Sequence, residues 1–170
     1  MIKILFRLLL IVLFAGLNGC STVPQAPVVE RSTNTERIIS NQPSDDASDK
    51  GSEIFSYAQS VLGTAYRYGG ADPSGFDCSG LVEYSHLHAG IRVPRTSLAQ
   101  YDAAQSVPRS ALKPGDVIFF NLDQKKTSHV GIYAGKGRFI HAPSTGKYVS
   151  FANLSEPYWK ERIVKTGRLY

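Results

Sequence analysis

Cysteine is scarce in this sequence. Only 2 of its 170 residues are cysteines, Cys20 and Cys78. If Cys20 is consumed by a modification, Cys78 has no partner within the chain, and we expect no disulfide. A lone thiol in an oxidising compartment is a liability unless its reactivity is used. The scarcity therefore makes Cys78 a candidate functional residue, with a buried and inert thiol as the alternative.

The apolar run near the N-terminus, Leu8 to Phe14, is too short to cross a bilayer as a helix. It follows two basic residues and leads to small residues before Cys20, which is the pattern of a secretory signal peptide over residues 1–19. Residues 17–20, Leu-Asn-Gly-Cys, resemble the bacterial lipobox, in which the cysteine is acylated and begins the mature protein. This resemblance implies a membrane anchor at Cys20, and Ser21 after it implies the outer membrane, facing the periplasm. An ordinary signal peptide with a chance cysteine is the alternative.

Aromatic residues are absent from residues 21–50, which are rich in Ser, Thr, Asn, Pro and Asp. Such a segment has too little apolar surface to form a core. We therefore predict a lipidated, flexible tether over residues 20–50. The remaining residues, 51–170, have a common size for one domain with one core, and they contain no internal repeat.

A strong excess of charge is also absent. Residues 51–170 contain 14 Lys or Arg and 9 Asp or Glu, a net charge of +5. A basic surface suits an anionic polymer. No stretch interleaves basic and aromatic residues as single-strand binders do, so we expect no nucleic-acid partner. An anionic cell-wall polymer fits an exported protein better.

Apolar residues at helical spacing predict a short amphipathic helix over Glu53 to Leu62, closed by Gly63. A second helix is predicted from Cys78 to His88, with Gly90 as its stop. A third, short helix is predicted around Leu98 to Ala103.

The pattern changes after a Lys-Pro-Gly-Asp turn at residues 113–116. Short apolar or alternating runs then predict five strands: Val117 to Phe120, His129 to Ala134, Arg138 to His141, Tyr148 to Phe151 and Arg162 to Leu169. Helices followed by a meander of strands indicate an α+β fold with an antiparallel sheet.

Cys78 would be the first residue of the second helix, where unpaired backbone N–H groups and the helix dipole lower the pKa of a thiol. His129 and His141 lie at or beside predicted strands, where an inward-facing imidazole could meet a helix packed on the sheet. We therefore predict His129 as the base that takes the thiol proton and His141 as the group that orients it. Such a Cys, His, His triad requires no cofactor.

Five ordered motifs between Glu53 and Tyr170 resemble the NlpC/P60 family of cell-wall cysteine endopeptidases, which have a papain-like fold. They are Tyr66-Arg67-Tyr68-Gly69-Gly70, Phe76-Asp77-Cys78-Ser79-Gly80, Pro114-Gly115-Asp116, Ser128-His129-Val130-Gly131-Ile132-Tyr133 and Phe139-Ile140-His141-Ala142. Several motifs in order are far more specific than any one of them.

The resemblance assigns Cys78 as nucleophile, His129 as base and His141 as the orienting residue, which are the roles that the chemical argument above gives them. It also places Tyr66 beside the nucleophile, where its hydroxyl would help to hold the oxyanion. Asp77 and Ser79 would line the site and touch substrate. The implied partner is peptidoglycan, cut at an amide bond of its stem peptides. That bond would join γ-D-glutamate to a diamino acid, or D-alanine to diaminopimelate in a cross-link. The motifs do not separate the two bonds, and they identify no regulatory protein partner.

Three alternatives remain open from the residues. The same three side chains could be ligands of a zinc ion with an open fourth position. The protein could be a non-catalytic peptidoglycan-binding lipoprotein that uses its aromatic side chains. It could also be an amidase or acyltransferase that uses the triad on a different carbonyl.

The lipobox resemblance predicts that Cys20 carries a diacylglycerol thioether and is the first residue of the mature protein. Mass spectrometry of the N-terminal peptide from the membrane fraction checks this. Cys20→Ser should leave the signal peptide attached and the peptide free of lipid. An unmodified thiol at Cys20, or a mature chain that starts elsewhere, would contradict the prediction.

Overall fold

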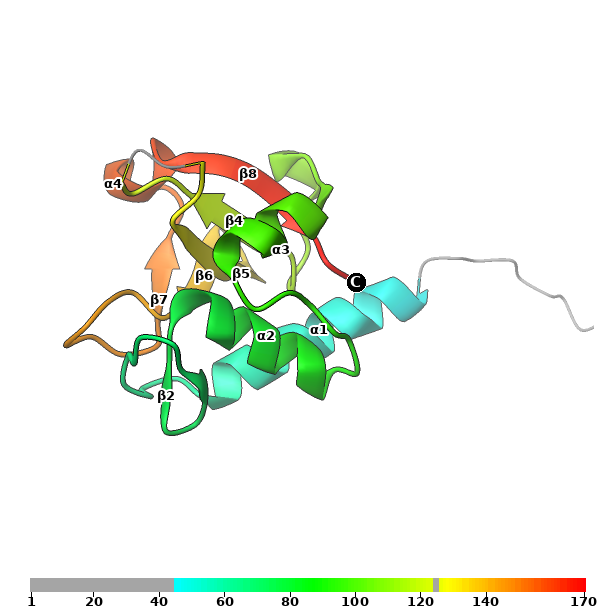
Figure 1. The fold of residues 1–170 in the computed structure, drawn as a ribbon. Helices are drawn as coiled ribbons and strands as arrows, with labels where there is room; N and C mark the ends of the chain where they lie inside the picture. The colour runs from blue at the N-terminus through cyan, green and yellow to red at the C-terminus, as the bar shows by residue number, and fades with distance from the viewer. Residues whose placement is uncertain (1–44, 124–125) are drawn as a thin grey trace, which may run out of the picture. The chain divides into compact units, whose positions relative to one another are not determined.

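In the computed structural model of the chain, residues 45–123 and 126–170 are described (Figure 1). The predicted signal peptide, Cys20 and the predicted tether up to residue 44 lie outside the described residues. None of the helices within the described ranges is both long and apolar enough to span a membrane.

Helix α1 spans Asp45–Ser60 and begins eight residues before the predicted start at Glu53. Residues 45–50 are therefore helical, so the predicted boundary of the flexible tether at residue 50 is wrong. The reason is a tertiary contact at Gly51. A Cβ atom there would lie 2.3 Å from the carbonyl oxygen of Pro114, so only glycine lets the first turns of α1 dock on the domain. In the sequence, the same glycine argues against a helix.

The predicted second and third helices are confirmed. Helix α2 spans Cys78–His88, and its N-cap is Asp77, whose carboxylate accepts a hydrogen bond from the backbone N–H of Gly80. Helix α3 spans Ser97–Ala103 and is capped by Thr96 in the same way.

A six-stranded antiparallel sheet follows, in the order β3-β8-β4-β5-β6-β7. Its strands are β3 Gln105–Ser106, β4 Val117–Phe120, β5 His129–Gly135, β6 Arg138–His141, β7 Ser150–Asn153 and β8 Ile163–Arg168. Four of the five predicted strands are confirmed to within one residue at each end, and the strand predicted over Tyr148 to Phe151 lies two residues further along the chain, as β7. The predicted meander holds only from β4 to β7, because β8 returns to pair with β4 and with the short β3.

The sequence did not predict the smallest elements. These are β1 Ala71–Asp72, β2 Gly75–Phe76, β3, a 3₁₀ turn at Arg109–Ala111 and α4 Pro157–Lys160. Two-residue strands and one-turn helices are too short to show a hydrophobic period, so only the surrounding structure defines them.

The sheet has two covered faces. On one face Val130 and Ile132 of β5 belong to the core that includes Ile54 of α1 and Leu81 of α2. Figure 1 shows these two helices side by side against the sheet. The opposite face carries a smaller, mostly aromatic cluster of Ile118, Phe120 and Phe139, against which Trp159 packs. The fold is therefore α+β, as predicted.

A buried ion pair closes the domain at its C-terminal end. The carboxylate of Asp116, fully buried, accepts two hydrogen bonds from Arg168, at 2.7 and 2.9 Å. The backbone N–H of Lys113 and the hydroxyl of Tyr170 also donate to it. This network joins the turn before β4 to the last strand.

Arg168→Met should lower the free energy of unfolding by about 3 kcal/mol, because it leaves the Asp116 carboxylate buried without its counter-charge. Arg67→Met is the matched control, since the Arg67–Asp72 pair has side chains 50% and 57% exposed and should cost less than about 1 kcal/mol. Urea unfolding measures both. Equal losses in the two variants would refute the role given to the buried pair.

Candidate active site

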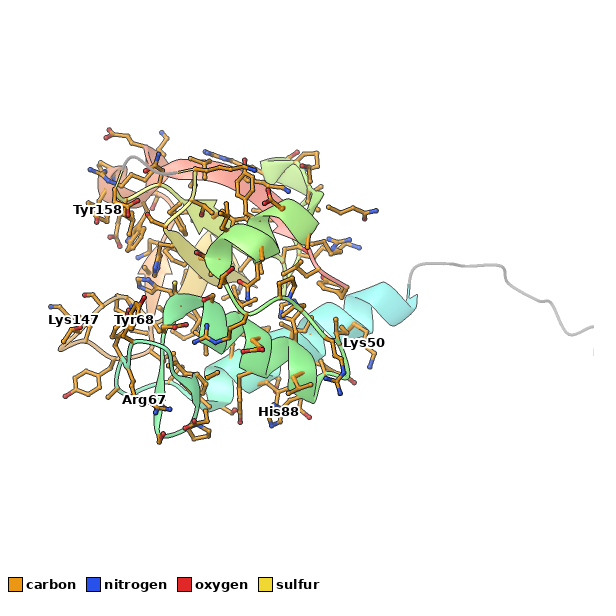
Figure 2. The ribbon with its side chains drawn as sticks, in the orientation of Figure 1. Lys50, Arg67, Tyr68, His88, Lys147 and Tyr158 are labelled. Carbon is orange, nitrogen blue, oxygen red and sulfur yellow. The ribbon has the colours of Figure 1, made fainter. Side chains whose placement is uncertain are left out.

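A hollow of about 450 Å³ opens at the start of α2. Its lining includes Cys78 and Ser79 of this helix, the Tyr66 to Gly69 loop, the segment before α3 and Ser128 just before β5. Tyr68 stands at its rim and is 89% exposed. Figure 2 shows Tyr68 on the same side of the domain as Lys147, whose carbonyl accepts a hydrogen bond from the backbone N–H of Tyr66.

Cys78 is the first residue of α2 and is partly exposed in this hollow. Burial raises the pKa of its thiol, although hydrogen bonding from the backbone N–H of Val130 acts in the opposite direction. The negative charge of Asp77 raises this pKa further. The lowered pKa expected for a helix N-terminus is therefore wrong, because the surrounding protein costs the thiolate more solvation than the helix end returns.

The sulfur of Cys78 lies beside the backbone of Val130, the residue after His129 in β5. His129 and His141 are 3% and 4% exposed, and the Nε2 atom of His129 lies 2.8 Å from the Nδ1 atom of His141. One imidazole donates this hydrogen bond and the other accepts it. The two predicted histidines are therefore hydrogen-bonded to each other, and Cys78 lies next to β5, the strand that carries His129.

Burial lowers the pKa of His129 to about 3 and the pKa of His141 to about 4, and the proximity of His141 adds to the effect at His129. Both imidazoles are therefore neutral at neutral pH. With the thiol also protonated, all three side chains are uncharged in this state, and the structure holds no preformed thiolate–imidazolium pair.

From the sequence we predicted that the side chains of the two histidines face the helices, and this prediction is wrong. They pack among the rings of Phe120, Phe139 and Trp159 on the other face of the sheet. The cause is the alternation of side chains along a strand: Val130 points to the helices, so its neighbour His129 points away.

The predicted Asp77 and Ser79 form a polar network whose main member the sequence did not reveal. The two terminal nitrogens of the Arg95 guanidinium donate to the Asp77 carboxylate, Nη1 at 2.9 Å and Nη2 at 2.7 Å. Nη1 also lies 3.0 Å from the hydroxyl of Ser79. Burial alone would raise the pKa of Asp77, but hydrogen bonds from Arg95 and from backbone N–H groups outweigh it, and the pKa is lowered. Arg95 lies in a loop without periodicity, so no sequence pattern could single it out.

Gln100 of α3 is a second residue that the sequence did not reveal. Its side chain is fully buried and its Nε2 atom donates to the backbone carbonyls of Ser79 and Pro94, at 3.0 and 2.8 Å. It thereby ties α3 to the start of α2, beside the nucleophile candidate.

Tyr66 lines the same hollow, as predicted. Burial raises the pKa of its hydroxyl, and the negative charge of Asp77, together with that of Cys78 whenever the thiol is ionised, raises it further. The hydroxyl therefore stays protonated and can donate a hydrogen bond to an anion that forms near Cys78.

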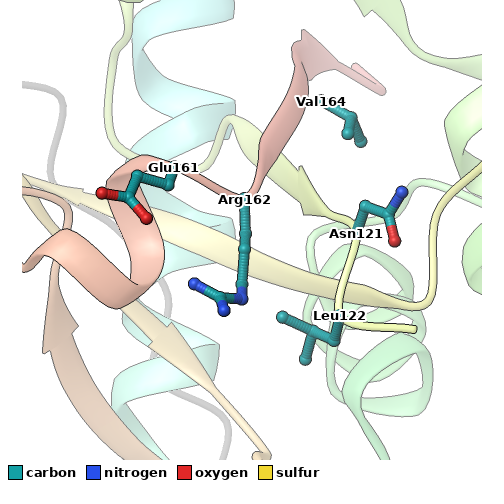
Figure 3. Close-up of a pocket in the computed structure, with 5 residues that line it drawn as sticks. All are labelled: Asn121, Leu122, Glu161, Arg162 and Val164. Atoms are coloured by element: carbon teal, nitrogen blue, oxygen red, sulfur yellow. The ribbon is translucent and has the colours of Figure 1, made fainter. Parts of the chain in front are cut away.

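A second hollow, of about 470 Å³, is lined by Asn121, Leu122, Glu161, Arg162 and Val164 (Figure 3). It contains neither a thiol nor an imidazole, so we assign no chemistry to it. Within residues 45–123 and 126–170, no three His, Cys, Asp or Glu side chains converge to hold a metal ion. The zinc alternative for Cys78, His129 and His141 therefore lacks a geometric basis.

Comparison with known proteins adds a family assignment. A model of the NlpC/P60 family matches residues 63–168. The chain is 43% identical over 113 residues to murein DD-endopeptidase MepH of Escherichia coli (strain K12), a match that covers 64% of this chain and 42% of that protein. It is 46% identical over 118 residues to gamma-DL-glutamyl hydrolase of Bacillus subtilis (strain 168), covering 68% of this chain and 28% of that protein. The match thus spans less than half the length of these two curated relatives.

Solved structures show the same similarity. An NlpC/P60 family protein from Bacillus cereus ATCC 10987 superposes with a TM-score of 0.66 at 32% identity, over 70% of this chain and 40% of that chain. The NlpC/p60 domain of peptidoglycan hydrolase SagA has a TM-score of 0.60 at 33% identity, over 69% of this chain and 97% of that domain.

Arg95→Met should raise the pKa of Asp77 and destabilise the protein by about 2 kcal/mol at pH 7, because a partly buried carboxylate loses two charged hydrogen bonds. A carboxylate with a lowered folded-state pKa contributes stability above its unfolded pKa of about 3.9 and loses it as the pH falls through the folded value. The difference between the variant and the parent should therefore shrink below about pH 4. Chemical unfolding at a series of pH values measures it.

The exposed neighbour Arg92 provides the control, since Arg92→Met should change stability little at any pH. An Arg95→Met penalty that is the same at pH 7 and pH 3 would contradict the assignment to Asp77.

Proposed function

Because the chain belongs to the NlpC/P60 family and has its papain-like α+β fold, we propose that it is a cysteine peptidase that hydrolyses amide bonds in peptidoglycan stem peptides. The observation that carries the proposal is the placement of Cys78. Its thiol opens into a hollow at the start of α2, beside the strand that carries His129, and His129 is hydrogen-bonded to His141.

In the proposed reaction the thiol of Cys78 loses its proton to His129 as the sulfur attacks the substrate carbonyl. The Nε2 atom of His129 faces His141, which leaves Nδ1 to receive the proton. His141 accepts a hydrogen bond from Nε2–H and so fixes both the tautomer and the ring orientation of the base. His129 then protonates the leaving amine, and water hydrolyses the acyl-enzyme.

The proposal gives three other residues supporting roles. The protonated hydroxyl of Tyr66 donates to the oxyanion that forms on the substrate carbonyl. Asp77 and Ser79, already held by Arg95, present oxygen atoms in the same hollow to the peptide. The arrangement suits a peptide substrate with polar groups on either side of the scissile bond.

The names of the relatives cover more than one bond, since one is a murein DD-endopeptidase and another is a gamma-DL-glutamyl hydrolase. The proposal therefore includes both the D-alanyl–diaminopimelate cross-link and the γ-D-glutamyl–diamino acid bond. Incubation with purified peptidoglycan, followed by mass analysis of the released fragments, identifies the bond and also separates a peptidase from an amidase or a non-catalytic wall-binding protein.

We also propose that the domain acts at the cell envelope, anchored through lipid on Cys20 at the outer membrane and facing the periplasm. The lipobox resemblance of residues 17–20 supports the anchor. The basic balance of residues 51–170 supports contact with an anionic wall polymer.

Substitutions in the triad should reduce stem-peptide hydrolysis in a defined order. Cys78→Ala should abolish it, because it removes the thiol that attacks the substrate carbonyl. His129→Ala should lower kcat by about 10²- to 10⁴-fold, the range for loss of a general base. His141→Ala should lower it less, because His141 acts through His129. Release of soluble peptides from purified peptidoglycan measures all three.

His88→Ala is the matched control, because His88 is exposed at the far end of α2 from Cys78 (Figure 2). It should retain full activity. Hydrolysis that persists in Cys78→Ala, or a greater loss in His141→Ala than in His129→Ala, would contradict the assigned roles.

A further inference from the structure

Trp159 packs against both histidines of the pair. It lies on α4, the one-turn helix between β7 and β8, and is itself partly exposed. Its ring centroid is 5.7 Å from that of His129 and 4.9 Å from that of His141. Because both imidazoles are almost fully buried, a partly exposed side chain that packs against both covers part of the pair on its solvent side.

The rings of Trp159, His129 and His141 pack at defined angles to one another. Trp159 is stacked on His129 at an interplanar angle of 29° and meets His141 edge-on at 89°. The two imidazoles stand at 81° to each other. The indole is thus in contact with both rings in the orientation that their 2.8 Å hydrogen bond requires.

The indole is itself held in place. It packs edge-on against Phe120 at 5.0 Å and against Phe139 at 5.1 Å. At the end of α4, the side chain of Arg162 donates to the carbonyl of Tyr158 at 2.8 Å, and the backbone N–H of Asn121 donates to the carbonyl of Arg162 at 2.8 Å. These bonds attach α4 to the end of β4, so the position of Trp159 depends on the sheet that carries the histidines.

We propose that Trp159 is a positioning residue for the histidine pair, which holds both imidazoles in their hydrogen-bonded orientation and keeps water out of the site where the proton moves. This inference rests on the proposed function for its effect on catalysis, but its effect on the imidazoles does not depend on any activity.

Few titratable groups affect this pair. The charge of His141 acts on His129, and burial alone accounts for the shift at His141. Cys78, on α2, is the remaining titratable group on the proposed proton path. Removal of the indole should therefore act mainly through water. Hydration of the pair favours the charged form, so both imidazole pKa values should rise toward their ordinary range.

The test compares Trp159→Ala, Trp159→Phe and Tyr158→Ala in the full chain. Tyr158 is the matched control, because it neighbours Trp159 on α4 and is 51% exposed; its ring meets that of Trp159 edge-on at 4.9 Å, but it is not among the rings that pack on the histidines in the described residues. Histidine ring signals followed by NMR over pH 3 to 8 report the imidazole pKa values, with exposed His88 as an internal reference. Stem-peptide hydrolysis over the same pH range reports kcat and KM.

In Trp159→Ala we expect the pKa values of His129 and His141 to rise by roughly one unit or more. The acidic limb of the rate profile should move up with them, since a base of higher pKa is already protonated at a higher pH. We expect kcat to fall about 10- to 100-fold through misplacement of the base, with KM nearly unchanged. Trp159→Phe, which keeps an aromatic face, should show a smaller shift and recover most of kcat, and Tyr158→Ala should match the parent.

Unchanged imidazole pKa values in both Trp159 variants, or an equal shift in Tyr158→Ala, would overturn the proposal. If Trp159→Ala does not fold, the smaller shift expected in Trp159→Phe decides it. If the parent protein does not hydrolyse stem peptides, the proposed function fails, but the NMR titration still tests whether Trp159 shields and orients the pair.

Discussion

The rest of the site depends on the interactions made by the carboxylate of Asp77. It caps α2 by accepting a hydrogen bond from the backbone N–H of Gly80, and it accepts another from the backbone N–H of Gly69 at 3.0 Å. It also forms a bidentate ion pair with Arg95. It thus joins the start of the helix, the Tyr66 to Gly69 loop and the segment before α3. Since Cys78 is the next residue, the same carboxylate fixes where the thiol stands in the hollow. Its charge also opposes formation of a thiolate there.

This opposition fits the state of the histidine pair. Burial keeps His129 and His141 neutral, and burial with a neighbouring carboxylate keeps Cys78 protonated. The three proposed triad residues are therefore uncharged before a substrate enters, although Asp77 and Arg95 beside them are charged, and in the proposed reaction one proton moves at the moment of attack. The aromatic side chains that pack around the imidazoles contribute to the burial that keeps them neutral.

Much of the fold followed from local pattern. Helix α2 and strands β4 and β6 have the bounds that hydrophobic pattern and turn residues predict, because each is a run of largely buried residues between turn or capping residues. Helix α1 begins earlier than predicted because Gly51 docks against the Pro114 turn. The position of β8 beside β4 was likewise decided by pairing between distant segments, which no local period records.

The sequence by itself determined the family, the fold class and the identity of Cys78, His129 and His141 as candidates, since motif order and the scarcity of cysteine are properties of the chain alone. The tertiary structure decided their environment. It turned the histidines to the aromatic face, raised the pKa of the Cys78 thiol, and recruited Arg95 and Trp159 from segments without any motif. The physical reason is that burial and charge at a site are set by whichever side chains folding brings around it, and those come from distant parts of the sequence.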